Sequence, residues 1–247
     1  MNFMPPRTRN LYDPKSKEPY KLSRSKIELF VNCPRCFYLD RRLGIGRPTG
    51  PAFSLNVAVD TLLKKEFDTH RARKSAHPLM KAYGIKAVPF LHQDIDLWRE
   101  NFKGVRFLHE PSGFLVTGAV DDVWVDKSGQ LIVVDYKATS KAGEVTLDGV
   151  WQKGYKRQMD IYQWLLRQQG FKVSNRGYFV YVNGRTDLAA FDGKLEFVVK
   201  LLPYDGDGGW IEQTLLAMKK CLRSSKLPKA SAECDHCSYI EAVKGVA

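Results

Sequence analysis

Two Cys-x-x-Cys pairs near opposite ends of the chain place the strongest constraint on its fold. The first pair is Cys33 and Cys36, and the second is Cys234 and Cys237. In a chain without an export signal, such pairs bind metal more often than they form disulfides. If the four sulfurs share one site, it holds a structural zinc ion or an iron–sulfur cluster and ties the N-terminal region to the C-terminal tail. The alternative is that one pair is incidental.

The chain has the composition of a globular protein, with 44% hydrophobic and 27% charged residues in 247. No apolar run approaches the roughly 18 residues that a membrane-spanning helix needs. The N-terminal segment lacks the apolar region of a secretory signal. We therefore expect a cytoplasmic protein that does not associate with membranes.

Positive charge is concentrated in the first part of the chain. Residues 1–110 contain 21 Lys and Arg against 11 Asp and Glu, whereas residues 111–247 contain 18 against 16. A basic region of this kind indicates a polyanionic partner such as nucleic acid. A solvated basic surface without a partner is the alternative.

Hydrophobic periodicity predicts a mixed α/β core, in which a short twisted sheet is flanked by helices. Residues 1–21 are expected to form a basic, irregular arm, and the residues after 222 are expected to form a polar tail that contains cysteines. Helices are expected at residues 53–68, 93–103, 151–169 and 210–222, and strands at 114–125, 131–138, 178–182 and 196–202.

Charged residues interrupt the apolar strand at 131–138. Asp135 and Lys137 are two residues apart and therefore share one face of the strand. If the preceding turn centres on Ser128, the residue opposite Asp135 is Asp121. Directly opposed residues in a hairpin have Cβ atoms about 5 Å apart. Asp122 is expected to point to the other face and to be exposed.

Two buried carboxylates at this spacing repel each other unless a cation lies between them. Oxygen ligands favour magnesium or manganese. Lys137 then lies where it can hold an attacking water and offset the charge of a pentavalent phosphate. The alternative is an Asp135–Lys137 ion pair, with Asp121 solvated.

These residues lie in motifs that resemble the RecB-type nucleases of the PD-(D/E)XK superfamily. The resemblance implies a restriction-endonuclease-like core. It implies that Asp121, Asp135 and the backbone carbonyl of Tyr136 bind the metal and that Lys137 is catalytic. It also implies that Gln158 and Tyr162 orient DNA, although Tyr162 fits the apolar stripe of its helix as well. The motifs are Gly118-Ala119-Val120-Asp121, Asp135-Tyr136-Lys137 and Gln158-Met159-Asp160-Ile161-Tyr162.

The resemblance extends over one domain at residues 22–240, with residues 241–247 as a tail. Many members have a metal-binding histidine on an upstream helix, and this chain has Asp60 at that position. Aspartate also binds hard cations. Asn56 replaces a small glycine of the family. The opening motif is Leu22-Ser23-Arg24-Ser25-Lys26, followed by Cys33-Pro34 and Phe37-Tyr38-Leu39.

The cysteines resemble those of AddB-type and CRISPR-associated RecB-like nucleases, which hold an iron–sulfur cluster with one upstream and three downstream cysteines. This chain has two and two, so Cys36 would replace the missing downstream ligand. The resemblance implies a [4Fe–4S] cluster at Cys33, Cys36, Cys234 and Cys237, with structural zinc as the alternative.

The function implied is that of a Mg²⁺- or Mn²⁺-dependent DNA nuclease, of exonuclease type, in DNA repair, recombination or CRISPR adaptation. The sequence contains no G-x-x-x-x-G-K-[ST] phosphate-binding loop, so unwinding needs a helicase partner. A CRISPR-adaptation protein is another possible partner. The alternative function is a catalytically inactive nucleic-acid-binding subunit of a nuclease complex.

Overall fold

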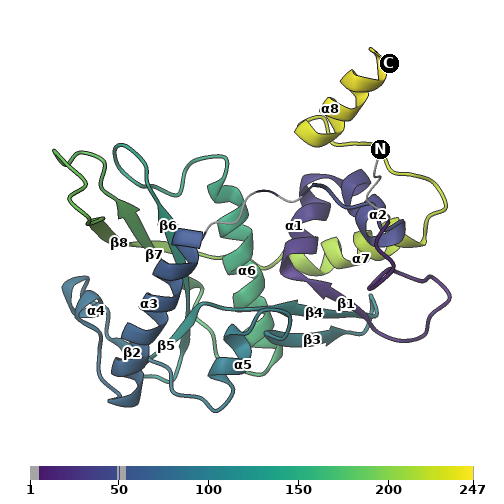
Figure 1. Ribbon diagram of the computed structural model, residues 1–247. Coiled ribbons are helices and arrows are strands. Elements are labelled where there is room, and N and C mark those ends of the chain that lie inside the picture. The colour runs from purple at the N-terminus through teal and green to yellow at the C-terminus, as the bar shows by residue number, and fades with distance from the viewer. Residues whose placement is uncertain (1–5, 49, 51–53, 247) are drawn as a thin grey trace. The chain divides into compact units, whose positions relative to one another are not determined.

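The computed structural model describes residues 6–48, 50 and 54–246. The chain divides into two compact units, each assembled from segments that are distant in sequence. The first unit contains residues 1–51, 107–117 and 209–247, and the second contains residues 52–106 and 118–208. Each unit has its own sheet and helices (Figure 1). The single domain predicted at residues 22–240 stays a prediction.

The second unit is built on a five-stranded sheet with the strand order β2-β5-β6-β7-β8. Its strands are antiparallel except for the central pair β6 and β7, which is parallel. A parallel pair needs a crossover connection, and helix α6 (Gln152–Gln168) provides it (Figure 1). The strands are β2 (Ala87–Pro89), β5 (Asp122–Asp126), β6 (Leu131–Thr139), β7 (Arg176–Gly184) and β8 (Phe197–Asp205).

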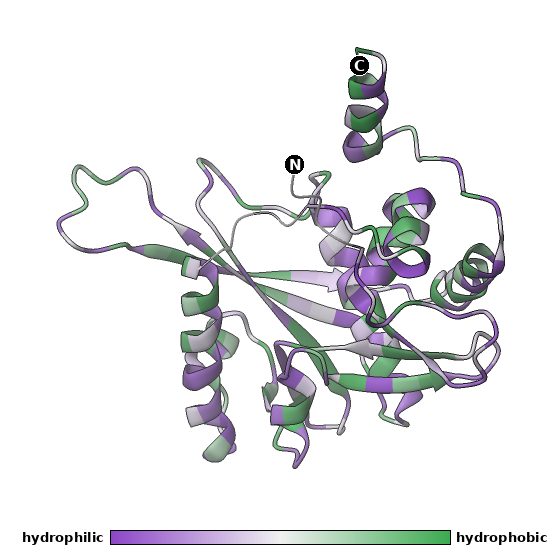
Figure 2. Ribbon diagram, turned by 45° about the vertical axis from the view of Figure 1, so that its right-hand side comes forward, coloured by the Kyte–Doolittle hydropathy of each residue, from purple (hydrophilic) through white to green (hydrophobic). Residues whose placement is uncertain are grey.

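Helices cover this sheet on both faces. Helix α3 (Ser54–Ala72) places Phe67 in a buried cluster with Trp124 of β5 and Tyr136 of β6. Hydrophilic and hydrophobic residues alternate along α3, as expected for a helix with one buried side (Figure 2). Helix α6 packs against Gly177 of β7, where a Cβ atom would come within 2.5 Å of the Met159 sulfur. The short helices α4 (Pro78–Ala82) and α5 (Ile95–Arg99) complete the second unit.

The first unit contains a three-stranded sheet with the order β1-β4-β3. Strand β1 (Tyr20–Ser23) runs parallel to β4 (Phe114–Gly118), and β3 (Val105–His109) lies on the other side of β4. The unit boundaries fall within β3 and β4, since Val105, Arg106 and Gly118 are assigned to the second unit. The unit's helices are α1 (Arg24–Asn32), α2 (Pro34–Arg42), α7 (Ile211–Arg223) and α8 (Asp235–Lys244).

The predicted mixed α/β architecture is confirmed, with three local corrections. The strand expected at 114–125 is two strands, because β4 pairs with β1 whereas β5 pairs with β2 and β6. The helix expected at 93–103 ends at Arg99, and the chain then turns through positive φ angles at Phe102 and Gly104. The tail after residue 222 contains helix α8, which begins after Cys234 with Asp235 in its first turn.

Among the described residues, no helix is both long and apolar enough to cross a bilayer.

Candidate active site and four-cysteine centre

Strand β6 presents Asp135 and Lys137 on one face of the second unit's sheet. Tyr136, between them, points to the opposite face and packs with Phe67 of α3. Asp135 is fully buried, the Lys137 side chain is 14% exposed, and the two form an ion pair. Burial works to lower the pKa of Lys137, but the charges of Asp135 and Asp121 outweigh it and raise that pKa. Lys137 is therefore a positively charged group next to a buried carboxylate.

The hairpin register predicted from the sequence is confirmed. Asp122 pairs with Val134 and Val123 pairs with Val133, so the next position along the hairpin sets Asp121 against Asp135. Asp121 immediately precedes β5, and its Oδ2 accepts a 2.9 Å hydrogen bond from the backbone N–H of Tyr136. Burial and the charge of Asp135 raise the pKa of Asp121 to about 7. The repulsion expected between two close carboxylates is thus present.

Lys64, which the sequence did not indicate as a site residue, lies beside both Asp60 and Asp121. The Lys64 ammonium lies 2.8 Å from Asp60 Oδ2 and 3.8 Å from Asp121 Oδ1. Lys64 is one helical turn after Asp60 on α3, and such a spacing is common for surface ion pairs. The sequence therefore gives no sign that Lys64 also reaches Asp121, because that contact depends on where α3 packs.

The carboxylates fit a hard divalent cation by their chemistry and by the environment of Asp135. Apart from the Lys137 ammonium, no described group donates a hydrogen bond to the buried oxygens of Asp135. A buried carboxylate with so few partners is costly unless a cation joins it. The ligand oxygens of Asp60, Asp121 and Asp135 do not all lie within 4.8 Å of one another. The ammonium groups of Lys64 and Lys137 balance the charge of these carboxylates.

Helix α6 contributes two of the predicted residues. Gln158 Oε1 accepts a 3.4 Å hydrogen bond from Lys137 Nζ, and Gln158 Nε2 donates a 3.0 Å bond to the hydroxyl of Tyr162. Both side chains are buried. The Lys137 ammonium also lies 4.7 Å from the ring centroid of Tyr155, on the same helix. The structure thus brings Gln158 and Tyr162 to Lys137.

The prediction that Asp122 is exposed is wrong. Its side chain is fully buried and accepts hydrogen bonds of 2.5 Å from Arg71, 2.9 Å from Arg99 and 2.9 Å from the Tyr136 hydroxyl. Asp122 does point away from Asp121, as predicted, but α3 and α5 cover that face. Asp68 accepts hydrogen bonds from the same two arginines. The result is a buried charge network directly behind the candidate site.

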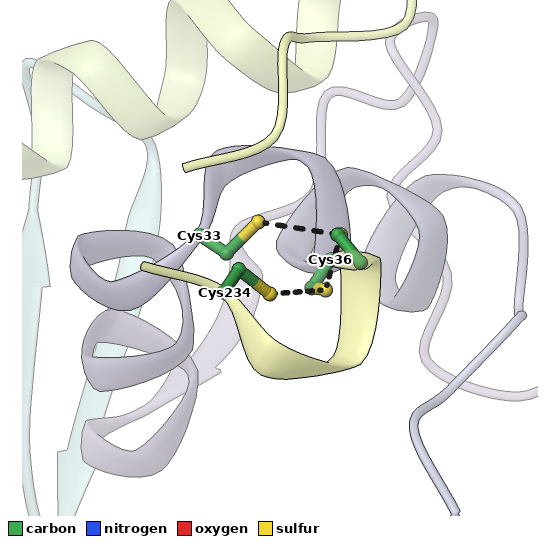
Figure 3. Close-up of side chains that lie close together, drawn as sticks. Cys33, Cys36 and Cys234 are labelled. Atoms are coloured by element: carbon green, nitrogen blue, oxygen red, sulfur yellow. Dashed lines mark hydrogen bonds between the residues drawn. The ribbon is translucent and has the colours of Figure 1, made fainter. Parts of the chain in front are cut away.

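The four predicted cysteines lie together in the first unit. Cys36 Sγ is 3.7 Å from Cys234 Sγ and 3.5 Å from Cys237 Sγ, and Cys33 Sγ is 3.8 Å from Cys237 Sγ. All four are buried, unpaired by disulfides, and within 4.8 Å of one another. In Figure 3 the side chains of Cys33, Cys36 and Cys234 point toward a common centre. The prediction that both pairs meet at one place is confirmed.

The sulfur spacing suits a metal held by four thiolates. A tetrahedral zinc ion with Zn–S bonds of 2.3 Å separates its sulfurs by about 3.8 Å. A [4Fe–4S] cluster binds each cysteine through a different iron and needs a wider arrangement. Burial raises the pKa of Cys33, but the backbone N–H groups of Cys36 and Ser231 outweigh it and lower that pKa to about 6. Arg47 donates a 3.2 Å hydrogen bond to Cys234 Sγ, which places a positive charge beside the sulfurs.

Comparisons with known proteins identify the family of the chain. No curated protein matches the chain. A solved structure titled "Crystal structure of SSO0001" is 15% identical, with 86% of this chain and 81% of that chain covered and a TM-score of 0.40. Residues 54–242 match the profile of the PD-(D/E)XK nuclease superfamily, and this segment contains every predicted residue of the acidic site. The mixed five-stranded sheet of the second unit, covered by helices, has the architecture of a restriction-endonuclease-like core. The chain therefore belongs to the PD-(D/E)XK nuclease superfamily.

Proposed function

We propose that the protein is a Mg²⁺- or Mn²⁺-dependent nuclease that hydrolyses DNA phosphodiester bonds. The observation that carries the proposal is the buried Asp135–Lys137 pair on β6, with Asp121 opposite it in the hairpin register. Removing Asp135 from solvent, with Lys137 and Asp121 partly buried beside it, has a free-energy cost that an exposed ion pair does not have. The superfamily match supports the same reading.

The proposed metal ligands are the carboxylates of Asp60, Asp121 and Asp135 and the backbone carbonyl of Tyr136. When bound, a divalent cation stabilises the negative charge that develops on the phosphate during hydrolysis. Asp60 takes the place of the histidine that the resemblance led us to expect, and it keeps an oxygen ligand suited to a hard cation.

Lys137 is proposed to orient the attacking water and to offset charge on the phosphate. A lysine whose pKa is raised stays protonated near neutral pH, so it acts as a hydrogen-bond donor and positive charge rather than as a base. Gln158 and the ring of Tyr155 hold its ammonium, and Tyr162 holds Gln158. Gln158 and Tyr162 are thus proposed to act on DNA orientation and on Lys137 together.

DNA is the proposed substrate because the first 110 residues are strongly basic. Contacts between lysine or arginine and phosphate release bound counterions, so affinity should fall steeply with salt. The proposed activity is that of an exonuclease acting on DNA ends. The proposed role is in repair, recombination or CRISPR adaptation, with a helicase or a CRISPR-adaptation protein as the partner. A cytoplasmic location belongs to the same proposal.

The test is cleavage of labelled DNA with Mg²⁺ or Mn²⁺. Asp135→Ala and Lys137→Ala should each abolish cleavage and largely preserve DNA affinity. Lys127→Ala, at the exposed turn of the same hairpin, is the matched control and should cleave normally. Normal rates in both site variants would refute the proposal. A wild-type protein that binds DNA and never cleaves it would support the inactive binding subunit instead.

We propose that the four cysteines form a structural metal centre in the first unit. The resemblance supports a [4Fe–4S] cluster, whereas the 3.5–3.8 Å sulfur distances support a single zinc ion. Anaerobic purification with metal analysis separates the two occupants. Brown protein with a broad absorption band near about 400 nm indicates the cluster. Colourless protein with one zinc per chain indicates zinc.

A further inference from the structure

Lys64 occupies an unusual position between two proposed metal ligands. Its ammonium is 2.8 Å from Asp60 and 3.8 Å from Asp121, although these residues come from α3 and from the segment before β5. The Lys64 side chain is only 23% exposed, so solvent screens the contacts less than in an ordinary surface pair. Lys64 therefore donates a hydrogen bond to Asp60 and lies within ion-pair distance of Asp121.

The formal charges of the site explain what Lys64 does there. Three carboxylates, Asp60, Asp121 and Asp135, face two ammonium groups, those of Lys64 and Lys137. Lys137 pairs with Asp135, which leaves Lys64 to balance Asp60 and Asp121. A divalent cation between these two carboxylates would experience strong repulsion from an ammonium group that stayed at this distance. Binding of the cation thus requires Lys64 to move.

The structure provides space for that movement. Lys64 lines an open surface pocket of about 440 Å³ in the second unit. Three carboxylates of the pocket can receive an ammonium group, and one of them, Asp96, forms no ion pair within the part of the chain that the structure describes. The other lining residues are Asp68, Leu97, Arg99 and Glu100. A displaced Lys64 side chain therefore finds room and negative charge on the same side of α3.

We propose that Lys64 is a displaceable counter-ion, which neutralises Asp60 and Asp121 in the metal-free protein and moves toward the adjacent pocket when a divalent cation binds. This inference rests on the proposed metal site and adds a residue that sets its affinity. Lys64 stabilises the empty site and competes with the cation, so it raises the metal concentration at which the site becomes half occupied.

The test is Mn²⁺ binding to the full-length protein, measured by calorimetry without DNA. Lys64→Met should bind Mn²⁺ about tenfold more tightly, the effect expected when one partly screened charge beside the site is removed. It should also unfold at a lower temperature without metal and gain more from added Mn²⁺. Lys65→Met, which removes an exposed lysine from the same helix, should match the wild type in both measurements.

The outcomes distinguish this inference from the proposed function. Equal or weaker Mn²⁺ binding by Lys64→Met, with wild-type binding that disappears in Asp135→Asn, would overturn the role of Lys64 and leave the metal site intact. Binding that is absent from the wild type and from Lys64→Met alike would overturn both. Lys64→Gln provides the same comparison if the methionine variant does not fold, and tighter binding by either neutral variant supports the inference.

Discussion

The hydroxyl of Tyr136 donates a 2.9 Å hydrogen bond to Asp122 on one face of the sheet, while its backbone N–H donates to Asp121 at the hairpin end. Tyr136 is therefore hydrogen-bonded to Asp121, which precedes β5, and to Asp122, which begins it. The buried network around Asp122 is expected to fix the position of Asp121 relative to Asp135. This relationship links stability of the second unit to the geometry of the candidate site.

Asp122→Asn should lower the free energy of unfolding by about 3 kcal/mol, because Arg71 and Arg99 stay buried without their full counter-charge. Urea unfolding followed by circular dichroism measures the loss. Asp205→Asn is the matched control, since its pair with Arg176 is exposed and screened by solvent, so this variant should lose much less stability. Similar losses in the two variants would contradict a stabilising buried network.

Gln158→Ala should lower the cleavage rate at saturating DNA by about tenfold or more, because Lys137 loses a partner that holds its ammonium. The KM for DNA should change much less if Gln158 acts mainly through Lys137. Single-turnover kinetics separates the two effects. Gln152→Ala, in the first turn of the same helix, should leave the rate unchanged. A selective rise in KM would indicate that Gln158 binds DNA and does not position Lys137.

Asp40→Asn should destabilise the protein in a pH-dependent way. Burial works to raise the pKa of Asp40, but Arg41 and Lys26 outweigh it and lower that pKa. A lowered pKa contributes stability above the ordinary carboxyl value of about 3.9, and the contribution is lost as pH falls through the folded-state pKa. The difference in unfolding free energy between wild type and variant should therefore be large at pH 7 and shrink below about pH 4. A difference that does not change with pH would show that charge at Asp40 is not the cause.

Cys36→Ser should remove the bound metal and lower the unfolding temperature, since Cys36 lies within 3.7 Å of both downstream sulfurs. Metal analysis and thermal unfolding on the same samples test this. Cys221→Ser is the control, because Cys221 lies outside the four-cysteine centre. Full metal content in Cys36→Ser would contradict a four-thiolate site.

The sequence was sufficient to predict features that depend on local rules. A turn centred on Ser128 and the two-residue repeat of a strand determine that Asp121 faces Asp135, and the structure has this register. Helical spacing likewise indicates that Gln158 and Tyr162 share one side of α6. The shared site of the cysteines was predicted from their spacing, because two Cys-x-x-Cys pairs in a chain without an export signal are typical of metal binding.

Other features depend on contacts between distant segments and could not be predicted in this way. Asp122 was expected to be exposed because no local pattern shows that Arg71 and Arg99 cover it. The role of Lys64 depends on the packing of α3 beside the hairpin. The split between β4 and β5 arises because each strand pairs with a different sheet, a choice that residues 114–125 do not encode by themselves.

The most direct test of the central claim is the initial rate of DNA cleavage as a function of Mn²⁺ concentration, for the wild type and for Asp135→Asn. We predict no cleavage after chelation, a saturable rise for the wild type, and a background rate for the variant at every concentration. Cleavage that continues without a divalent cation, or equal curves for the two proteins, would contradict a metal-dependent site at Asp121, Asp135 and Lys137.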